Sequence, residues 1–391
     1  MKKQRKNKNQ VKSIAYDRIS KNTRFKFMTY EKNCARNKIP TKKRIVKINS
    51  KRRKYLVVPQ KNSSWITLCP PETFCIYNDN FRYKTFKYIE DLEKIILGSK
   101  NNIFLDFFHV KESTAAAVLI LFATLDSILI KHSISQKIKL KKPANQRIQQ
   151  IFKHMGFFHL LSHKETITVD YPKIAQWKHI DGTKFEGKKL SEFIDKIMLS
   201  AGINLEDSGT YSTDYYVGIK EAICNSVEHA YDASEYADRN NSLILNKWWV
   251  YGCFNEAEQS IIFLICDLGM GIPRSLQIRH GAAVANIFEA VGNVVRRDCD
   301  FISAALVLQK SRTGNAERGK GLPELCAYVD DSETGYLKIN SYKGQLLYEA
   351  NSTHGPILES FKKGVNGTII EWNVPLTSIR EKLSNHEKAS I

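Results

Sequence analysis

Apolar and polar positions alternate in different ways along the chain, and the difference divides it into parts. Between residues 57 and 163, short apolar runs alternate with segments of helical period, which predicts a mixed sheet covered by helices. The clearest elements are a hydrophobic strand at residues 102–110 and an apolar helix from Ala115 to Lys131. Further strands are predicted at residues 55–59, 65–70, 73–77 and 138–143, and further helices at residues 88–97 and 144–155.

The second part begins with residues 165–190, which show no clear period and which we expect to connect two domains. Farther on, two strands at residues 247–254 and 260–267 flank a polar turn and predict a hairpin. The remaining predicted elements are helices at residues 190–199, 281–296 and 300–310 and strands at residues 336–341, 345–349 and 368–374. Both parts together predict the α/β class.

One helix of the second part carries a polar stripe. Ser212 and Thr213 offer oxygens for its N-cap, and no Pro or Gly interrupts the turns that carry the stripe. Glu221, Asn225 and His229 follow at intervals of four residues and therefore share one face. Its apolar surface is expected from Val217, Ala222, Ile223 and Val227. A polar stripe is typical of a solvated face, so alone it predicts no chemistry.

Two glycine-rich segments follow the stripe. A buried strand ends in Asp267, and Gly269 and Gly271 form a turn directly after it. Farther on, a short loop opens a helix, as loops do that bind phosphates through backbone N–H groups. This loop consists of Gly319, Lys320 and Gly321. Each segment alone is more often a tight turn or a helix cap.

The order and spacing of the three segments carry more information than any one of them. Together they resemble the GHKL ATPases, a superfamily that includes DNA gyrase, heat-shock chaperones, histidine kinases and anti-sigma-factor serine kinases. The polar stripe corresponds to the N box of the family, and the two glycine segments correspond to its glycine boxes. A Gly-Thr pair that opens the last strand of the family is present as Gly367 and Thr368. The resemblance covers residues 191–376 and implies a Bergerat-type α/β sandwich that binds ATP and Mg²⁺.

The resemblance implies roles at the adenine end of a nucleotide. Asp267 would accept a hydrogen bond from the adenine amino group, a group that guanine lacks at that position. Thr368 would support this bond through a water molecule. Gly269 and Gly271 would leave room for the base.

The resemblance also implies roles at the phosphate end. Asn225 would offer its amide oxygen to Mg²⁺, and Glu221 would orient and deprotonate a water molecule or an acceptor hydroxyl. His229 would touch ribose or phosphate, with a structural role as the alternative. The phosphates would be bound by Gly319, Lys320 and Gly321, and the candidates for lid contacts are Arg312 and Arg318.

Two departures from the family pattern narrow the comparison. Arg318 stands where many members have a glycine, which makes closure of the lid less free. Glu228 stands three residues after Asn225, where sensor histidine kinases commonly have a lysine. The His-Ala-Tyr ending of the N box is closer to the anti-sigma-factor serine kinases.

The first part of the chain resembles the STAS domain, the fold of anti-sigma-factor antagonists. In that family a strand leads into a short turn whose Ser or Thr caps the next helix and is a site of phosphorylation. The corresponding turn here is Glu112-Ser113-Thr114. Ser113 is therefore a candidate phosphosite, and a role as a simple N-cap is the preferred alternative. The resemblance implies a protein partner for this part.

The charge of the chain is concentrated at its start. The net charge is +20, and residues 1–56 hold 21 Lys and Arg against Asp17 and Glu31, so 19 of these charges lie there. We expect a basic, disordered arm, which is either only a solubilising tail or a contact for nucleic acid, ribosome or anionic membrane. Eight cysteines without a CxxC pair indicate a reducing cytoplasm. No apolar segment is long enough for a membrane span, and no secretory signal is expected.

These observations predict a basic arm at residues 1–56, a STAS-like domain at 57–165, an ATP-binding domain at 166–380 and a tail at 381–391. The function predicted first is an ATP–Mg²⁺-dependent switch with ATPase activity. The alternatives are a serine/threonine kinase that acts on a partner or on its own STAS-like domain, and a nucleotide-sensing module that places the arm on nucleic acid, as in a defence system. The partner and the oligomeric state, a homodimer included, stay open.

Overall fold

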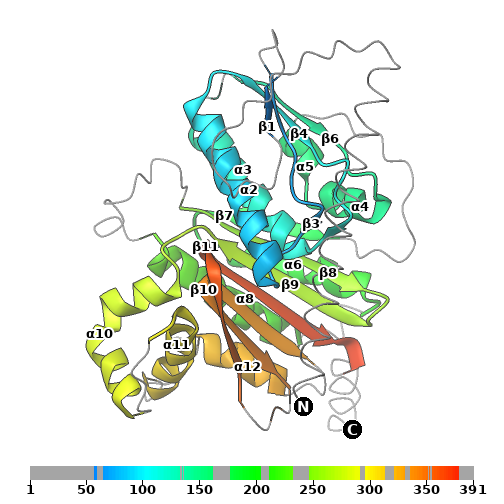
Figure 1. Ribbon diagram of the computed structural model, residues 1–391. Helices are drawn as coiled ribbons and strands as arrows, with labels where there is room; N and C mark the ends of the chain where they lie inside the picture. The colour runs from blue at the N-terminus through cyan, green and yellow to red at the C-terminus, as the bar shows by residue number, and fades with distance from the viewer. Residues whose placement is uncertain are drawn as a thin grey trace, which may run out of the picture. The chain divides into compact units, whose positions relative to one another are not determined.

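The computed structural model confirms the mixed α/β class of the chain (Figure 1). It describes residues 57–59, 65–132, 134, 136–161, 177–203, 211–231, 246–290, 296–312, 321–330, 335–350, 352 and 355–377. The predicted basic arm at residues 1–56 and the predicted tail at residues 381–391 lie outside these ranges.

A small parallel sheet lies in the first part of the chain. Its strands β2 (Trp65–Leu68), β4 (Asn102–Asp106) and β6 (Ile138–Lys141) are paired in that order. The short strands around it are β1 (Val57–Pro59), β3 (Thr73–Phe74) and β5 (Glu112–Ser113), of which β3 and β5 pair in parallel. The helices of this part are α2 (Asp79–Gly98), α3 (Ala115–Lys131), α4 (Gln146–His154) and α5 (Phe157–Leu160).

Side-chain caps fix where these helices begin. Asn78 caps α2, and Asn145 caps α4 by accepting hydrogen bonds from the next turn. At α3 the cap is Thr114, whose Oγ1 accepts from the backbone N of Ala117 at 3.3 Å. The N-cap interpretation of Ser113 was therefore wrong by one residue, because Ser113 still belongs to strand β5.

The second part contains a five-stranded antiparallel sheet of order β10-β11-β9-β8-β7. Its strands are β7 (Lys178–Gly182), β8 (Trp248–Asn255), β9 (Ser260–Asp267), β10 (Tyr336–Glu349) and β11 (Ile357–Pro375). The helices are α6 (Gly187–Ser200), α8 (Tyr211–His229), α10 (Ile272–Ala290), α11 (Asp298–Arg312) and α12 (Gly321–Asp330).

Several predicted boundaries were wrong in this part. Strand β7 lies inside the stretch that had been predicted as a connection. It was missed because Ile180 is its only buried residue, so the strand shows no apolar pattern in the sequence. Helix α8 begins at Tyr211, so Ser212 and Thr213 belong to its first turn. Helix α10 begins at Ile272 and is kinked at His280, where only its second half had been predicted.

The two predicted strands near residue 342 are one strand. β10 continues through an irregularity in its pairing with β11, with Tyr342 at a φ of 49° and register shifts on both sides of it. The sequence Tyr-Lys-Gly after Ser341 had therefore indicated a bulge rather than the end of a strand. β11 likewise begins at Ile357, well before the predicted residue 368.

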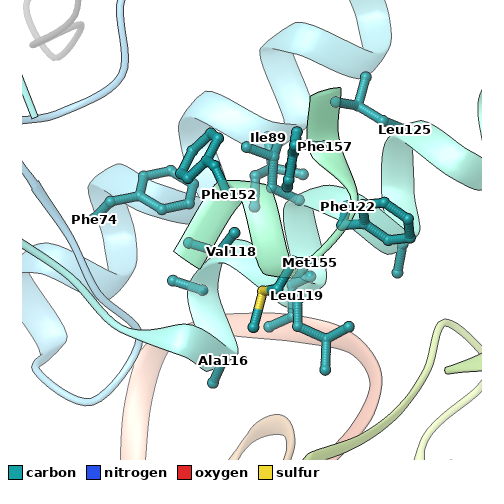
Figure 2. Packing of buried hydrophobic residues seen from close by; sticks show 14 of the residues in the cluster. Phe74, Ile89, Ala116, Val118, Leu119, Phe122, Leu125, Phe152, Met155 and Phe157 are labelled. Carbon is teal, nitrogen blue, oxygen red and sulfur yellow. The ribbon is translucent and has the colours of Figure 1, made fainter. Parts of the chain in front are cut away.

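Both faces of the five-stranded sheet are covered. On β8, Trp248 and Val250 belong to the core shared with α6, α8 and α12, whereas Trp249 and Tyr251 point to the opposite face. That opposite face packs with α2 and α3 of the first part, and Figure 2 shows apolar side chains of α3 beside those of α4 and α5. The two predicted domains therefore share a hydrophobic core across the boundary predicted at residue 165.

A buried arginine joins α2 to the β10–β11 pair. Arg82 is 0% exposed, and its guanidinium donates to the carbonyl oxygens of Ile76, Tyr342 and Lys363 and to Asn340 Oδ1 at 2.8–3.0 Å. Burial lowers the pKa of Arg82 to about 10, so the group stays charged at neutral pH. Two of these hydrogen bonds, to Ile76 O and Asn340 Oδ1, are buried, and the other two are partly buried, so Arg82 is the shared donor of acceptors that have little access to water.

We expect Arg82→Met to lower the free energy of unfolding by about 3 kcal/mol, because it leaves several buried acceptors without their donor. The measurement is urea unfolding of the full chain at pH 7. Arg147→Met, at an exposed position of α4, is the matched control and should change stability by less than about 0.5 kcal/mol. Equal effects of the two substitutions would contradict the role of Arg82.

Candidate functional site

A cavity of about 630 Å³ lies over the face of the sheet that α8 and α12 cover. It is lined by α8, by the end of β9 and the turn after it, by α10, α11 and α12, and by β11. The polar residues of the lining are Glu221, Asn225, Ser226, Glu228, His229, Asp267, Ser275, Arg279, His280 and Thr368. Segments that are far apart in the sequence thus meet at one hollow.

Helix α8 presents its polar stripe to this cavity. Glu221, Asn225 and His229 all line it, and each stands about 6 Å along the helix axis from the next. The helix can lie close to the sheet because Gly218 has no side chain: a Cβ there would be 2.6 Å from Leu325 and 3.0 Å from Trp372. Close packing of the apolar face therefore turns the stripe toward the cavity.

The apolar face of α8 differs from prediction in one residue. Ala222 and Ile223 are buried as predicted, and Val217 is half-buried. Val227 is 38% exposed, although its spacing had placed it with the apolar surface. It follows Ser226, which is buried and bonded to the neighbouring strand end, so the packed face of the last turn is shifted toward that serine.

Asp267 ends β9 at the floor of the cavity. Its side chain is buried, with Oδ1 accepting from Gly269 N at 2.8 Å and Oδ2 accepting from Ser226 Oγ at 3.4 Å. Burial raises the pKa of this carboxyl from 3.8 to about 6, although hydrogen bonds from Gly269, from the Thr368 backbone and from Ser226 lower it. At pH 7 the group is mostly an ionised acceptor.

The glycines around Asp267 permit close approach of backbones. A Cβ at Gly269 would lie 2.3 Å from Ala230 O, so this glycine packs against the end of α8. Gly269 is not among the described residues that line the cavity. Gly271 does line the cavity, at a φ of 73°. Gly367, at a φ of 82°, lets β11 approach Asp267 O, which a Cβ there would meet at 2.1 Å.

Ser341 is a residue of this region that the sequence did not reveal. It is 0% exposed, and its Oγ lies 3.1 Å from Thr368 Oγ1, donates to Gly367 O and accepts from Ile272 N at 2.9 Å. One hydroxyl thus joins β10, the middle of β11 and the start of α10. A single serine inside a strand carries no sequence signal for such a role.

Arg279 and His280 also line the cavity without having been predicted. Arg279 Nη2 donates to Glu228 O at 2.9 Å, which joins α10 to the last turn of α8. Of the described residues that line the cavity, Arg279 alone is a lysine or arginine. His280 lies at the kink of α10, with φ −138° and ψ 25°. Both were missed because the helix had been predicted to begin only at residue 281.

The other candidates lie partly outside the described residues. Arg318, Gly319 and Lys320 belong to a segment that the structure does not describe. Helix α12 begins at Gly321, and the next residue, Leu322, lines the cavity, so the start of this helix lies at the site. Arg312 is the last residue of α11, and its side chain is outside the description.

Ser113 is remote from the cavity in the topology of the chain. It ends β5 and precedes α3, and α3 packs against the sheet face that is opposite the cavity. Its Oγ is half-buried and donates to Thr114 O at 3.4 Å.

The described part of the chain offers neither a protein-only metal cluster nor a membrane helix. None of its His, Cys, Asp and Glu residues gather in groups of three or more that could hold a metal ion. Within the same ranges, every helix is too short or too polar to cross a bilayer. No protein-family model matches the chain, and no curated protein matches it.

The raised pKa of Asp267 predicts a pH dependence of stability. Between pH 3.8 and about 6 the folded state holds a proton that the unfolded state has lost, so this contribution is present at low pH and is lost as the pH rises through 6. We therefore expect the unfolding free energy of the wild type relative to Asp267→Asn to increase by about 1 kcal/mol from pH 7.5 to pH 5.

Urea unfolding of both proteins at the two pH values measures this difference, and the titration of all other groups cancels between them. A difference that is independent of pH, or that falls toward pH 5, would contradict the burial of this carboxyl.

Proposed function

We propose that this chain binds ATP with Mg²⁺ in the cavity between α8, α10, α12 and the sheet, and hydrolyses it as a nucleotide-driven regulatory switch. The observation that carries the proposal is the convergence of the polar stripe, Asp267, Gly271 and Thr368 on one cavity. These residues come from three distant segments, and a GHKL-like site needs them together. The proposal thus rests on geometry and on the resemblance of the motifs.

The adenine amino group would bind at Asp267. A buried carboxylate that is ionised at pH 7 accepts a hydrogen bond from an amino group more strongly than a neutral acceptor does. The backbone N–H groups of Gly269 and Thr368 hold this carboxylate in place, so little reorganisation is needed on binding. The hydroxyls of Thr368 and Ser341 form a hydrogen bond with each other. This bond holds the Thr368 hydroxyl in place at the adenine end of the cavity.

The phosphate end would lie along the stripe of α8. Asn225 and Glu221 are half-buried oxygen donors that line the cavity, and such hard ligands suit Mg²⁺. Magnesium that is bound together with phosphates needs only one or two protein ligands, so the described residues fit it without a larger cluster. The ion, when bound, neutralises phosphate charge. Glu221 would accept the proton of the attacking water, and Arg279 would add positive charge.

The alternative functions receive different support. A kinase that phosphorylates its own Ser113 is disfavoured, because the sheet separates α3 from the cavity. Phosphoryl transfer to a partner protein would use the same site and the same Glu221. The nucleic-acid interpretation depends on residues 1–56, which the structure does not describe. ATP hydrolysis needs no acceptor other than water, so it is the function that we propose first.

Two substitutions separate binding from chemistry. We expect Asp267→Asn to weaken ATP binding at least about tenfold, because it replaces a charged acceptor by a neutral amide. Glu221→Ala should bind ATP nearly as well as the wild type but lower kcat by at least about 100-fold, since it removes the general base. Calorimetry gives the affinity, and phosphate release with Mg²⁺ gives the turnover.

Glu192→Ala, on the exposed side of α6, is the control and should leave both quantities unchanged. Wild-type protein that binds no ATP would refute the proposal. Binding without either phosphate release or a phosphoprotein would reduce the function to nucleotide sensing.

A further inference from the structure

The turn after Asp267 is held against the end of α8 by contacts within the protein. Met270 N donates to Ala230 O at 2.8 Å, and Gly269 packs directly on Ala230. Leu268 N donates to the hydroxyl of Tyr231 at 2.9 Å. The three residues that follow Asp267 are therefore fixed by two consecutive residues at the end of the polar-stripe helix.

The Tyr231 hydroxyl stands between the ends of two strands. It accepts from Leu268 N and donates to Lys247 O at 2.6 Å. In the antiparallel register of β8 and β9, Trp248 pairs with Asp267, so Lys247 and Leu268 would form the next pair. The hydroxyl thus takes the place of a backbone hydrogen bond, which it can do because a phenol both donates and accepts.

This insertion determines where β9 stops being a strand. With a side-chain oxygen between Lys247 and Leu268, the two strands cannot continue their ladder beyond Asp267. The chain leaves the sheet at that point and turns along the end of α8 toward the cavity. Asp267 is consequently the last residue of β9, and its side chain lines the cavity.

Lys247, whose carbonyl oxygen accepts the hydrogen bond from Tyr231, has a side chain that is held by two carboxylates. Lys247 Nζ lies 2.6 Å from an Asp126 oxygen and 2.6 Å from an Asp181 oxygen, and its side chain is 12% exposed. Asp126 Oδ2 also accepts from Trp249 Nε1 at 2.9 Å. Asp126 belongs to α3, so the side chain of Lys247 is anchored to a helix of the first part of the chain.

We propose that Tyr231 is a positioning residue of the nucleotide site. Its hydroxyl ends the β8–β9 ladder at Asp267 and directs the carboxylate and the glycine turn toward the cavity, and Asp126 of α3 supports it through Lys247. This inference rests on the proposed function, since it concerns the same site. It gives the first part of the chain a physical connection to the adenine end of the cavity.

A second tyrosine provides a matched control. Tyr251 is on β8, and its hydroxyl also donates to a backbone carbonyl, that of Met155, at 3.0 Å. It lies on the opposite face of the sheet, in the core around α3. Removing either hydroxyl deprives a backbone carbonyl of a donor, whereas only Tyr231 contacts the turn after Asp267.

The test compares Tyr231→Phe with Tyr251→Phe in the full chain. Calorimetry with adenosine and with ATP–Mg²⁺ measures affinity, and hydrogen exchange of the peptide that contains residues 261–276 reports on the turn. We expect Tyr231→Phe to weaken adenosine binding at least tenfold and to accelerate exchange at Leu268. Tyr251→Phe should leave both affinities within twofold of the wild type. Equal affinities of the two variants, or unchanged exchange at Leu268 in Tyr231→Phe, would overturn the proposal.

Asp126→Asn tests the contribution of α3, because it removes the charge opposite Lys247 and keeps an acceptor for Trp249. We expect the same direction of change with a smaller size, about threefold in adenosine affinity. Unchanged affinity and exchange would overturn this part of the inference. If the wild type binds neither adenosine nor ATP, the proposed function fails, and exchange at Leu268 in Tyr231→Phe still decides whether the hydroxyl positions the turn.

Discussion

The burial of one carboxylate, that of Asp267, is the constraint on which the rest of this site depends. An ionised group in the interior is costly unless hydrogen bonds compensate for the lost water. Gly269, Thr368 and Ser226 supply those bonds, and each comes from a different element. Two glycines permit close backbone contacts around the acid, because a Cβ at Gly269 would meet Ala230 O and a Cβ at Gly367 would meet the backbone oxygen of Asp267.

A second constraint comes from the sheet, whose two faces are both apolar. The face toward α8 and α12 forms the floor of the cavity, and the other face is covered by the first part of the chain. The helices of that part therefore form a layer over this face of the five-stranded sheet. Arg82 and the Asp126–Lys247 pair join this layer to the sheet. A change in this layer can reach the site through Lys247, directly before the start of β8.

Local patterns in the sequence were sufficient for a large part of this account. The apolar helix from Ala115 to Lys131 and the hairpin of β8 and β9 follow from period and turn residues, and the structure confirms them. The polar stripe, Asp267 and Thr368 could be named because their motifs resemble those of the GHKL ATPases, and the structure brings these residues to one cavity. Their proposed chemistry stays a prediction.

What the sequence did not reveal depends on contacts between distant residues. Strand β7 has one fully buried residue, so only its pairing with β8 makes it a strand. Ser341 and Tyr231 act through hydrogen bonds to segments far from them in the chain, and neither has a local pattern. Arg279 was missed because α10 begins directly after the glycine turn, at Ile272, whereas the helix had been predicted only from residue 281. The hydrophobic core shared by the two parts of the chain was not predicted for the same reason. No local pattern in the sequence indicates which face of a sheet another part of the chain will cover.

The most direct measurement is a crystal structure of the chain with Mg²⁺ and a non-hydrolysable ATP analogue. The account predicts the adenine amino group at the Asp267 carboxylate, Mg²⁺ at Asn225 and the terminal phosphate facing Glu221. Nucleotide bound at another place, or a cavity that stays empty at saturating nucleotide, would contradict the assignment of this cavity as the ATP site.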